Sequence, residues 1–119
     1  MSELKPYAEP VAVPKLVQGD IYFMVTYVDN HMLVPDIKTL VFLGRDVANE
    51  GDDLLYFQDI DSYVKSGAFP NNASAGGELY TCANNQLNNI FELDNMRDEL
   101  RRCAMRRSGR QGEPYDFLI

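Results

Sequence analysis

The chain of 119 residues has no tryptophan, one histidine, two cysteines and fewer basic than acidic side chains, 11 against 18. Cys82 and Cys103 form no C-x-x-C pair, so the sequence predicts two free thiols and neither a disulfide framework nor a metal or cofactor site. A Ser or Cys hydrolase would need His31, which lies in a predicted turn. No catalytic residue is predicted, although catalysis by a pair of carboxylates follows no spacing rule and stays open.

Long apolar runs are absent as well, which excludes a membrane-spanning helix of ~18 residues or more. The net charge of −7 opposes nucleic-acid binding as the main task, since phosphate contacts need clustered Lys and Arg. The first residues lack the basic segment and apolar stretch of a secretory signal. We therefore expect a soluble cytoplasmic protein with no membrane partner and no nucleic-acid partner.

The length fits a single domain, because domains cluster near ~100 to 150 residues. Pro6, Pro10 and Pro14 recur across the first stretch and disfavour helix there, which predicts an extended arm over residues 1–18. A globular domain over 19–108 and a tail over 109–119 complete the predicted organisation.

Three runs rich in β-branched and aromatic residues indicate strands over Ile21–Val28, Ile37–Leu43 and Leu54–Gln58. The Asp29-Asn30-His31 turn separates the first two, and Met32–Val34 could begin the return strand before Pro35 interrupts it. No helix long enough for a crossover separates the runs, so an antiparallel, meander-like sheet is expected. Segments near 79–83 and 90–93 could supply a fourth and a fifth strand.

Two helices are expected. A short one lies near 60–66, with an acidic entry and Gly67 as its stop. An amphipathic C-terminal helix lies near 94–107, and its predicted apolar face comprises Met96, Leu100, Cys103, Ala104 and Arg107. The predicted fold class is α+β, with an antiparallel sheet of four to five strands.

The predicted strands are apolar on both faces, because neighbouring positions such as Leu40 and Val41 are both hydrophobic. A sheet with one face in water alternates apolar and polar residues instead. One helix shields only two or three strands, since it is ~10 Å wide and strands lie ~4.8 Å apart. The second face must be covered by the arm, by loops, by curling of the sheet or by another protein molecule.

Charge is segregated along the chain. Residues 1–96 hold 5 basic and 14 acidic side chains, whereas residues 97–110 hold 6 basic and 2 acidic ones. The arginine-rich helix end can complement the helix dipole and the acidic body, or it can contact an acidic partner.

These features predict a non-catalytic protein-binding or self-associating accessory module, in one version an inhibitor or immunity-type protein whose acidic body caps a cationic partner. The partner would be another protein or a second copy in a homodimer. The alternative is a small-ligand binder or enzyme with a cavity between sheet and loops. The candidate binding residues are Tyr22, Tyr27, Tyr56, Asp59, Asp61, Tyr63, Arg101 and Arg102.

Overall fold

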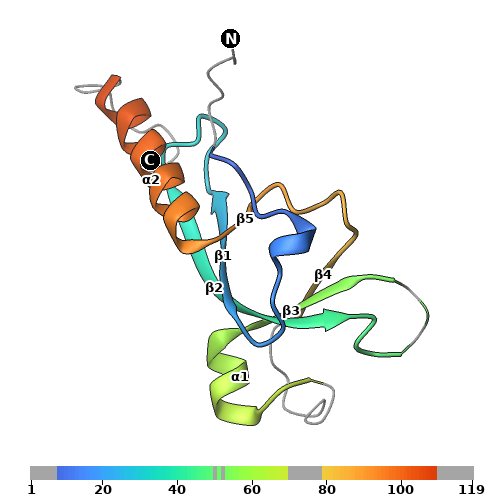
Figure 1. Cartoon of the computed structure of the whole chain (residues 1–119). Coiled ribbons are helices and arrows are strands. Elements are labelled where there is room, and N and C mark those ends of the chain that lie inside the picture. Colours follow the sequence, from blue (N-terminus) through green and yellow to red (C-terminus); the bar gives the residue numbers. More distant parts are fainter. Residues whose placement is uncertain (1–7, 50, 52, 70–78, 110–119) are drawn as a thin grey trace.

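The structure is a computed structural model that describes residues 8–49, 51, 53–69 and 79–109. Its five strands form one antiparallel sheet in the order β4-β3-β2-β1-β5, so the chain meanders from β1 to β4 and then returns to the far edge (Figure 1). Two helices accompany the sheet, which confirms the predicted α+β class. The elements are β1 (Ile21–Tyr27), β2 (Pro35–Arg45), β3 (Leu55–Asp59), α1 (Ile60–Ser66), β4 (Leu79–Cys82), β5 (Ile90–Phe91) and α2 (Leu93–Gly109), preceded by a 3-10 turn at Val13–Lys15.

The turn between β1 and β2 depends on Asp29. Its carboxylate accepts hydrogen bonds from the backbone N–H groups of Leu33 and Val34, both at 2.9 Å. Met32 has a left-handed backbone, with φ of 61°, so Met32–Val34 is loop and does not begin the return strand. β2 begins at Pro35 instead, because proline is tolerated at the first residue of a strand.

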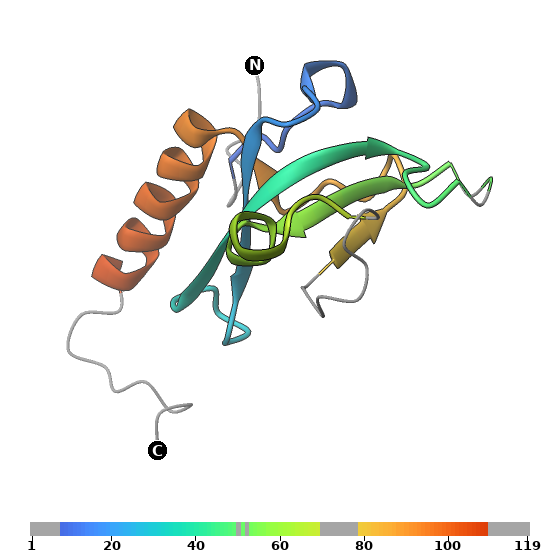
Figure 2. The same ribbon diagram turned by 90° about the horizontal axis from the view of Figure 1, so that it is seen from below.

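The sheet curls strongly along β2, which is its longest strand. The pairing with β3 shifts between Phe42 and Gly44, and Gly44 has a φ of 133° that favours glycine. Beyond this bulge β3 and β4 run across the direction of β1 (Figure 1), and Figure 2 shows the curl from below. The curl gives the sheet one concave face and one convex face.

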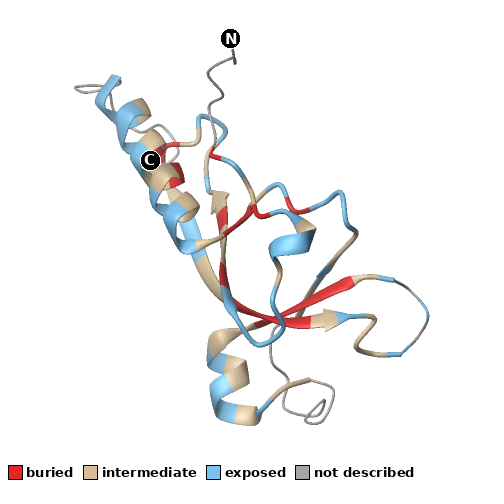
Figure 3. Ribbon diagram, viewed as in Figure 1, coloured by how far each residue is buried: buried red, intermediate tan, exposed pale blue. Residues whose placement is uncertain are grey.

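The concave face, here the arm face, carries the main core and is covered by the N-terminal arm. Val11 is buried against it, and the N–H of Val11 donates to the carbonyl oxygen of Ile90 at 2.8 Å. Tyr22 packs edge-on against Phe42 and Phe57, with ring centroids 6.5 and 6.4 Å away. The buried members of this core are Val11, Tyr22, Leu40, Phe42, Leu55, Phe57, Leu87 and Ile90 (Figure 3).

The convex face, here the helix face, is covered at its two ends by the two helices. α2 lies over Val25 of β1 and Phe91 of β5. α1 and the segment that follows it lie over Val41, Leu43 and Tyr56. An arm on one face and two helices on the other thus cover most of the apolar residues on both faces of the strands.

The predicted apolar face of α2 is wrong in part. Cys103 is buried as expected, but Ala104 and Arg107 are exposed and the second buried residue is Glu99. A carboxylate can replace an apolar side chain here because it is fully hydrogen-bonded, as described below.

The predicted domain limits reach beyond the described residues. Of the arm, residues 1–7 lie outside them, and so does nearly all of the tail, residues 110–119. Neither α1 nor α2 has the length and apolarity that crossing a bilayer requires, in the part of the chain that is described.

Candidate functional site

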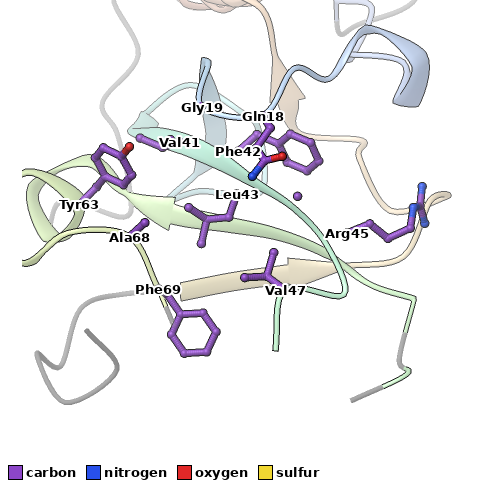
Figure 4. A pocket seen from close by; sticks show the side chains of 11 residues that line it. Gln18, Gly19, Val41, Phe42, Leu43, Arg45, Val47, Tyr63, Ala68 and Phe69 are labelled. Carbon is purple, nitrogen blue, oxygen red and sulfur yellow. The ribbon is translucent and has the colours of Figure 1, made fainter. Parts of the chain in front are cut away.

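A groove of about 470 Å³ lies on the helix face, between β2 and α1, and is the candidate functional site (Figure 4). Tyr63 of α1 and the following Ala68 and Phe69 line one side, and Gln18 and Gly19 line another. The remaining lining residues belong to β2 and its end: Val41, Phe42, Leu43, Gly44, Arg45 and Val47. The groove is open to solvent, and its apolar floor of Val41, Leu43 and Val47 is accompanied by as much polar as apolar exposed lining.

Gly19 lines the groove at the point where the chain enters β1. The N–H of Gly19 donates to the carbonyl oxygen of Phe42 at 2.8 Å, so this residue continues the β1 side of the sheet next to β2. A Cβ atom at Gly19 would meet nothing within 4 Å, and its φ of 88° disfavours any other residue. The backbone conformation, and not crowding, therefore requires glycine at this position.

Gln58 of β3 holds in place the side of the groove that is formed by α1 and the segment after it. Its amide nitrogen donates to the Ser62 hydroxyl at 2.9 Å and to the Gly67 carbonyl at 3.1 Å. Its amide oxygen accepts from the N–H of Phe69 at 3.0 Å. Because Gln58 is only 4% exposed, these bonds are shielded from water, and one side chain fixes both the helix α1 and the segment after it.

Two further contacts complete this wall. Asp59 caps α1, since its carboxylate accepts from the N–H of Asp61 at 3.0 Å. The ring of Phe69 stacks on that of Tyr56, with centroids 6.2 Å apart and planes inclined by 12°. The cap thus fixes the start of α1, and the stack fixes Phe69 in the segment that follows the helix.

Arg45 is the charged residue among those that line the groove. Asp46 follows it in the chain, but the Asp46 carboxylate accepts from the N–H of Gly51 at 3.1 Å. Arg45 is the basic lining residue, but its side chain extends away from the apolar floor in Figure 4 and pairs with Asp53 at 3.1 Å. The charge of Arg45 is therefore offset by Asp53.

The helix face is not fully covered between the two helices. Ile21 and Ile37, which lie opposite Val41 and Val25 in the pairing of β1 with β2, are 49% and 42% exposed. Phe23 and Thr39, which pair with each other between them, are partly buried. We call these four residues (Ile21, Phe23, Thr39 and Ile37) the central strip, and it meets the groove where Ile21 faces Val41.

A second group of polar residues is buried under α2. The Glu99 carboxylate accepts hydrogen bonds from the Tyr27 hydroxyl and, at 2.7 Å, from the N–H of Ala8. Arg106 lies 3.8 Å from this carboxylate, donates to the Tyr27 hydroxyl at 2.9 Å and to the Met32 carbonyl at 2.9 Å, and sits over the Tyr27 ring. The cluster therefore joins the arm, β1, the β1–β2 loop and α2.

The surroundings change the acidity of this cluster. Burial, followed by the hydrogen bond and the negative charge of Glu99, raises the pKa of Tyr27 far above its usual range. Burial likewise raises the pKa of the Cys103 thiol, whose sulfur contacts the Leu33 carbonyl at 3.5 Å. Neither group is prepared to ionise near neutral pH, so the cluster is suited to a structural role.

The predicted site residues fall in different places. Tyr63 lines the groove, while Asp59 and Asp61 lie at the start of the same short helix. Tyr22 is buried on the arm face, where its hydroxyl accepts from Val17 N–H and donates to the Lys15 carbonyl. The remaining candidates are Tyr27 in the Glu99 cluster, Tyr56 under Phe69, and Arg101 and Arg102, which each pair with Asp98 at 3.1 Å.

The pairing of Asp98 has an electrostatic consequence. Hydrogen bonds from Arg101 and Arg102 lower the pKa of its carboxyl group, so both arginines face an ionised partner on their own helix. The arginine-rich end of α2 is therefore partly neutralised within the helix. None of these placements tests a binding role, which stays a prediction for all eight residues.

Sequence reasoning missed Gln58, Phe69 and Leu43 as parts of the site. Gln58 had a usable signal, because it is a polar residue closing an otherwise apolar run, Leu54–Gln58. Phe69 and Leu43 had none, since their role depends on how distant segments pack.

The site offers apolar surface and a few polar groups. Across the described ranges, no three His, Cys, Asp or Glu side chains gather into a group that could hold a metal ion. His31 is exposed in the β1–β2 loop, which does not contribute to the groove. Comparison with protein-family models, with curated proteins and with solved structures finds no match for the chain.

Proposed function

We propose that this protein is a non-catalytic, protein-binding or self-associating accessory module. The observation that supports it best is the central strip, where Ile21 and Ile37 leave nearly half of their surface in water on an otherwise covered sheet face. Apolar side chains that cluster on a sheet surface beside a groove are typical of interaction sites. The partner is another protein or a second copy of this chain.

The acidic composition supports a version of this function in which the module caps a cationic partner, as inhibitor and immunity-type proteins do. Opposite charge steers the encounter of two proteins and raises the association rate. The cytoplasm is the proposed location, which is supported by the two cysteines, Cys82 and Cys103, both present as free thiols.

Photo-crosslinking in the native cell tests this function. A photoreactive phenylalanine analogue replaces Ile21 or Ile37, and in matched controls it replaces Val28 or Val64, which are more exposed apolar residues outside the strip. We expect a discrete adduct, with a second copy or with one partner protein, from positions 21 and 37 only. Equal labelling from all four positions, or no adduct from any, would contradict the proposal.

The second candidate function is binding of a small ligand, which is favoured by the groove itself. Its volume falls within the ~300 to 1,000 Å³ that is usual for ligand sites, and the Tyr63 hydroxyl offers a polar group beside an apolar floor. A small molecule that raises the melting temperature of the wild type and of Tyr80→Ala, but not that of Tyr63→Ala, would favour this candidate over the first.

A further inference from the structure

We propose that α2 is a releasable cover of the helix face, which stays docked while the Glu99 carboxylate is ionised and detaches when this carboxylate takes up a proton. Release uncovers apolar residues that lie next to the central strip. Acidity thus controls how much of the helix face is open to water.

Few apolar contacts hold α2 on the sheet. Of its 17 residues, Glu99 and Cys103 are buried, and Met96 is partly buried against Val25 and Phe91. Among the described residues, neither the main core on the arm face nor the cluster under α1 contains a residue of α2. The attachment of the helix therefore depends on the polar contacts that Glu99 and Arg106 make.

The groups that surround the Glu99 carboxylate are hydrogen-bond donors. One oxygen accepts from the N–H of Ala8 at 2.7 Å, and the other accepts from the Tyr27 hydroxyl. The Tyr27 oxygen in turn accepts from Arg106 at 2.9 Å, and the Arg106 guanidinium lies 3.8 Å from the carboxylate. A carboxylate suits these partners because it only accepts, whereas a carboxylic acid carries a hydrogen of its own. Protonation therefore adds a hydrogen at a contact where the partner already donates, and it removes the charge that attracts Arg106.

Glu99 is the member of this cluster whose charge changes on acidification. Burial raises the pKa of Tyr27 and the pKa of Cys103, so both groups are neutral at neutral pH and stay neutral as the pH falls. Arg106 keeps its positive charge throughout, because a guanidinium does not lose its proton in proteins. Protonation of Glu99 thus converts a buried pair of opposite charges into a single positive charge.

The other segments packed around Glu99 present backbone and apolar groups. The arm contributes the N–H of Ala8, and β5 contributes Phe91. The β1–β2 loop offers α2 the carbonyl oxygens of Met32 and Leu33. These segments also carry four titratable residues that bind elsewhere or face solvent: Glu9, Asp29, His31 and Glu92.

Detachment of α2, which lies along one end of the sheet in Figure 2, uncovers apolar surface beside the central strip. Val25 and Phe91 are 3% and 1% exposed while the helix is docked. Val25 pairs with Ile37, and Phe91 pairs with Phe23. The strip and the two uncovered residues then form one continuous apolar face, which is the kind of surface that binds another protein.

Amide hydrogen exchange of the full chain, followed by NMR at a series of pH values and corrected for the intrinsic exchange rate, tests this proposal. We expect the amides of α2 to lose protection by about tenfold or more at a pH where the amides of β2 and β3 are still protected. His31→Gln is a control for the histidine of the β1–β2 loop and should leave this transition unchanged.

Two variants assign the transition to Glu99. Glu99→Gln carries no charge at any pH, so its α2 amides should be about tenfold or more less protected than those of the wild type at neutral pH, with no further transition of their own on acidification. Asp94→Asn removes an exposed carboxylate of the same helix and should behave as the wild type.

Tyr27→Phe removes a donor to the ionised carboxylate and should move the α2 transition to higher pH by about one unit. A purely structural role of Tyr27 would instead lower the protection of α2 equally at all pH values. The wild-type titration and this variant complete the test if the Gln variant does not fold.

Three results would overturn the proposal: loss of protection in α2 and in β2 at the same pH, an α2 that is as protected in Glu99→Gln as in the wild type at neutral pH, or an unchanged transition in Tyr27→Phe. The outcome is independent of the proposed function, because the sample contains no partner protein. Crosslinking from positions 21 and 37 tests that function separately.

Discussion

Glu99 is the residue on which the attachment of α2 depends most. It is 1% exposed, and its carboxylate accepts hydrogen bonds from the Tyr27 hydroxyl and from the N–H of Ala8. The Arg106 guanidinium lies 3.8 Å from the same carboxylate. Apart from Cys103 no other residue of the helix is buried, so little apolar area holds it. A charge buried with its partners stabilises a unique arrangement, but removing one member leaves the others unsatisfied.

We therefore expect Glu99→Ala to lower the free energy of unfolding by about 3 to 5 kcal/mol. Urea denaturation measures this loss, and amide hydrogen exchange should show its largest increase within α2. Asp94→Ala is the matched control, because Asp94 is 92% exposed and its pair with Arg97 spans 3.9 Å. Equal destabilisation by both substitutions would show that burial of the Glu99 cluster contributes nothing.

At the scale of the elements, α1 shows how a helix of 7 residues is kept in place. So short a helix is not stable by itself in water. It is fixed at its start by the Asp59 cap and at its end by Gln58, which also holds Phe69. The position of this side of the groove therefore depends on these few hydrogen bonds.

Replacing Gln58 by Leu, which has a similar size, should destabilise the protein by about 1 to 3 kcal/mol, because the N–H of Phe69 and the Ser62 hydroxyl lose their partner. The amide of Phe69 should then exchange faster with solvent. Gln86→Leu serves as control, since Gln86 is exposed and its side-chain oxygen accepts from Ala83 N–H near the surface. A Gln58 variant as stable as the Gln86 variant, with unchanged exchange at Phe69, would refute this role.

The elements themselves were predictable, and their contacts were not. The β-branched and aromatic runs predicted β1, β2 and β3 to within two residues at each end, because strand propensity is a local property. The buried face of α2 was mispredicted because the partners of Glu99, Tyr27 and Ala8, lie 72 and 91 positions away. Gly19 lines the groove because it pairs with β2, and this pairing depends on strand register, which leaves no local pattern in the sequence.

At the scale of the whole molecule, the N-terminal arm acts as a structural layer. Val11 is 4% exposed within the main core, and no helix shares the arm face with it in the residues described. The arm thus takes the place of a second helix layer.

Truncating Val11 to Ala should cost about 2 kcal/mol, from the buried methyl groups removed and the cavity that they leave. Val17→Ala in the same arm should cost almost nothing, because Val17 is 54% exposed. Thermal or urea unfolding of the two variants gives the comparison. If Val11→Ala is as stable as Val17→Ala, the arm does not contribute to the core.

The position of the arm also determines the order in which the fold can form. Val11 bonds to Ile90 and Ala8 to Glu99, so residues synthesised early wait for partners that emerge some 80 to 90 positions later. Until then the core on the concave side lacks Leu87 and Ile90. Contacts of such long range slow folding, and the incomplete sheet meanwhile presents an apolar surface to its surroundings. We conclude that a ribosome-bound chain lacking α2 is not yet a folded unit, and that the core closes only after Ile90 and Glu99 have been added.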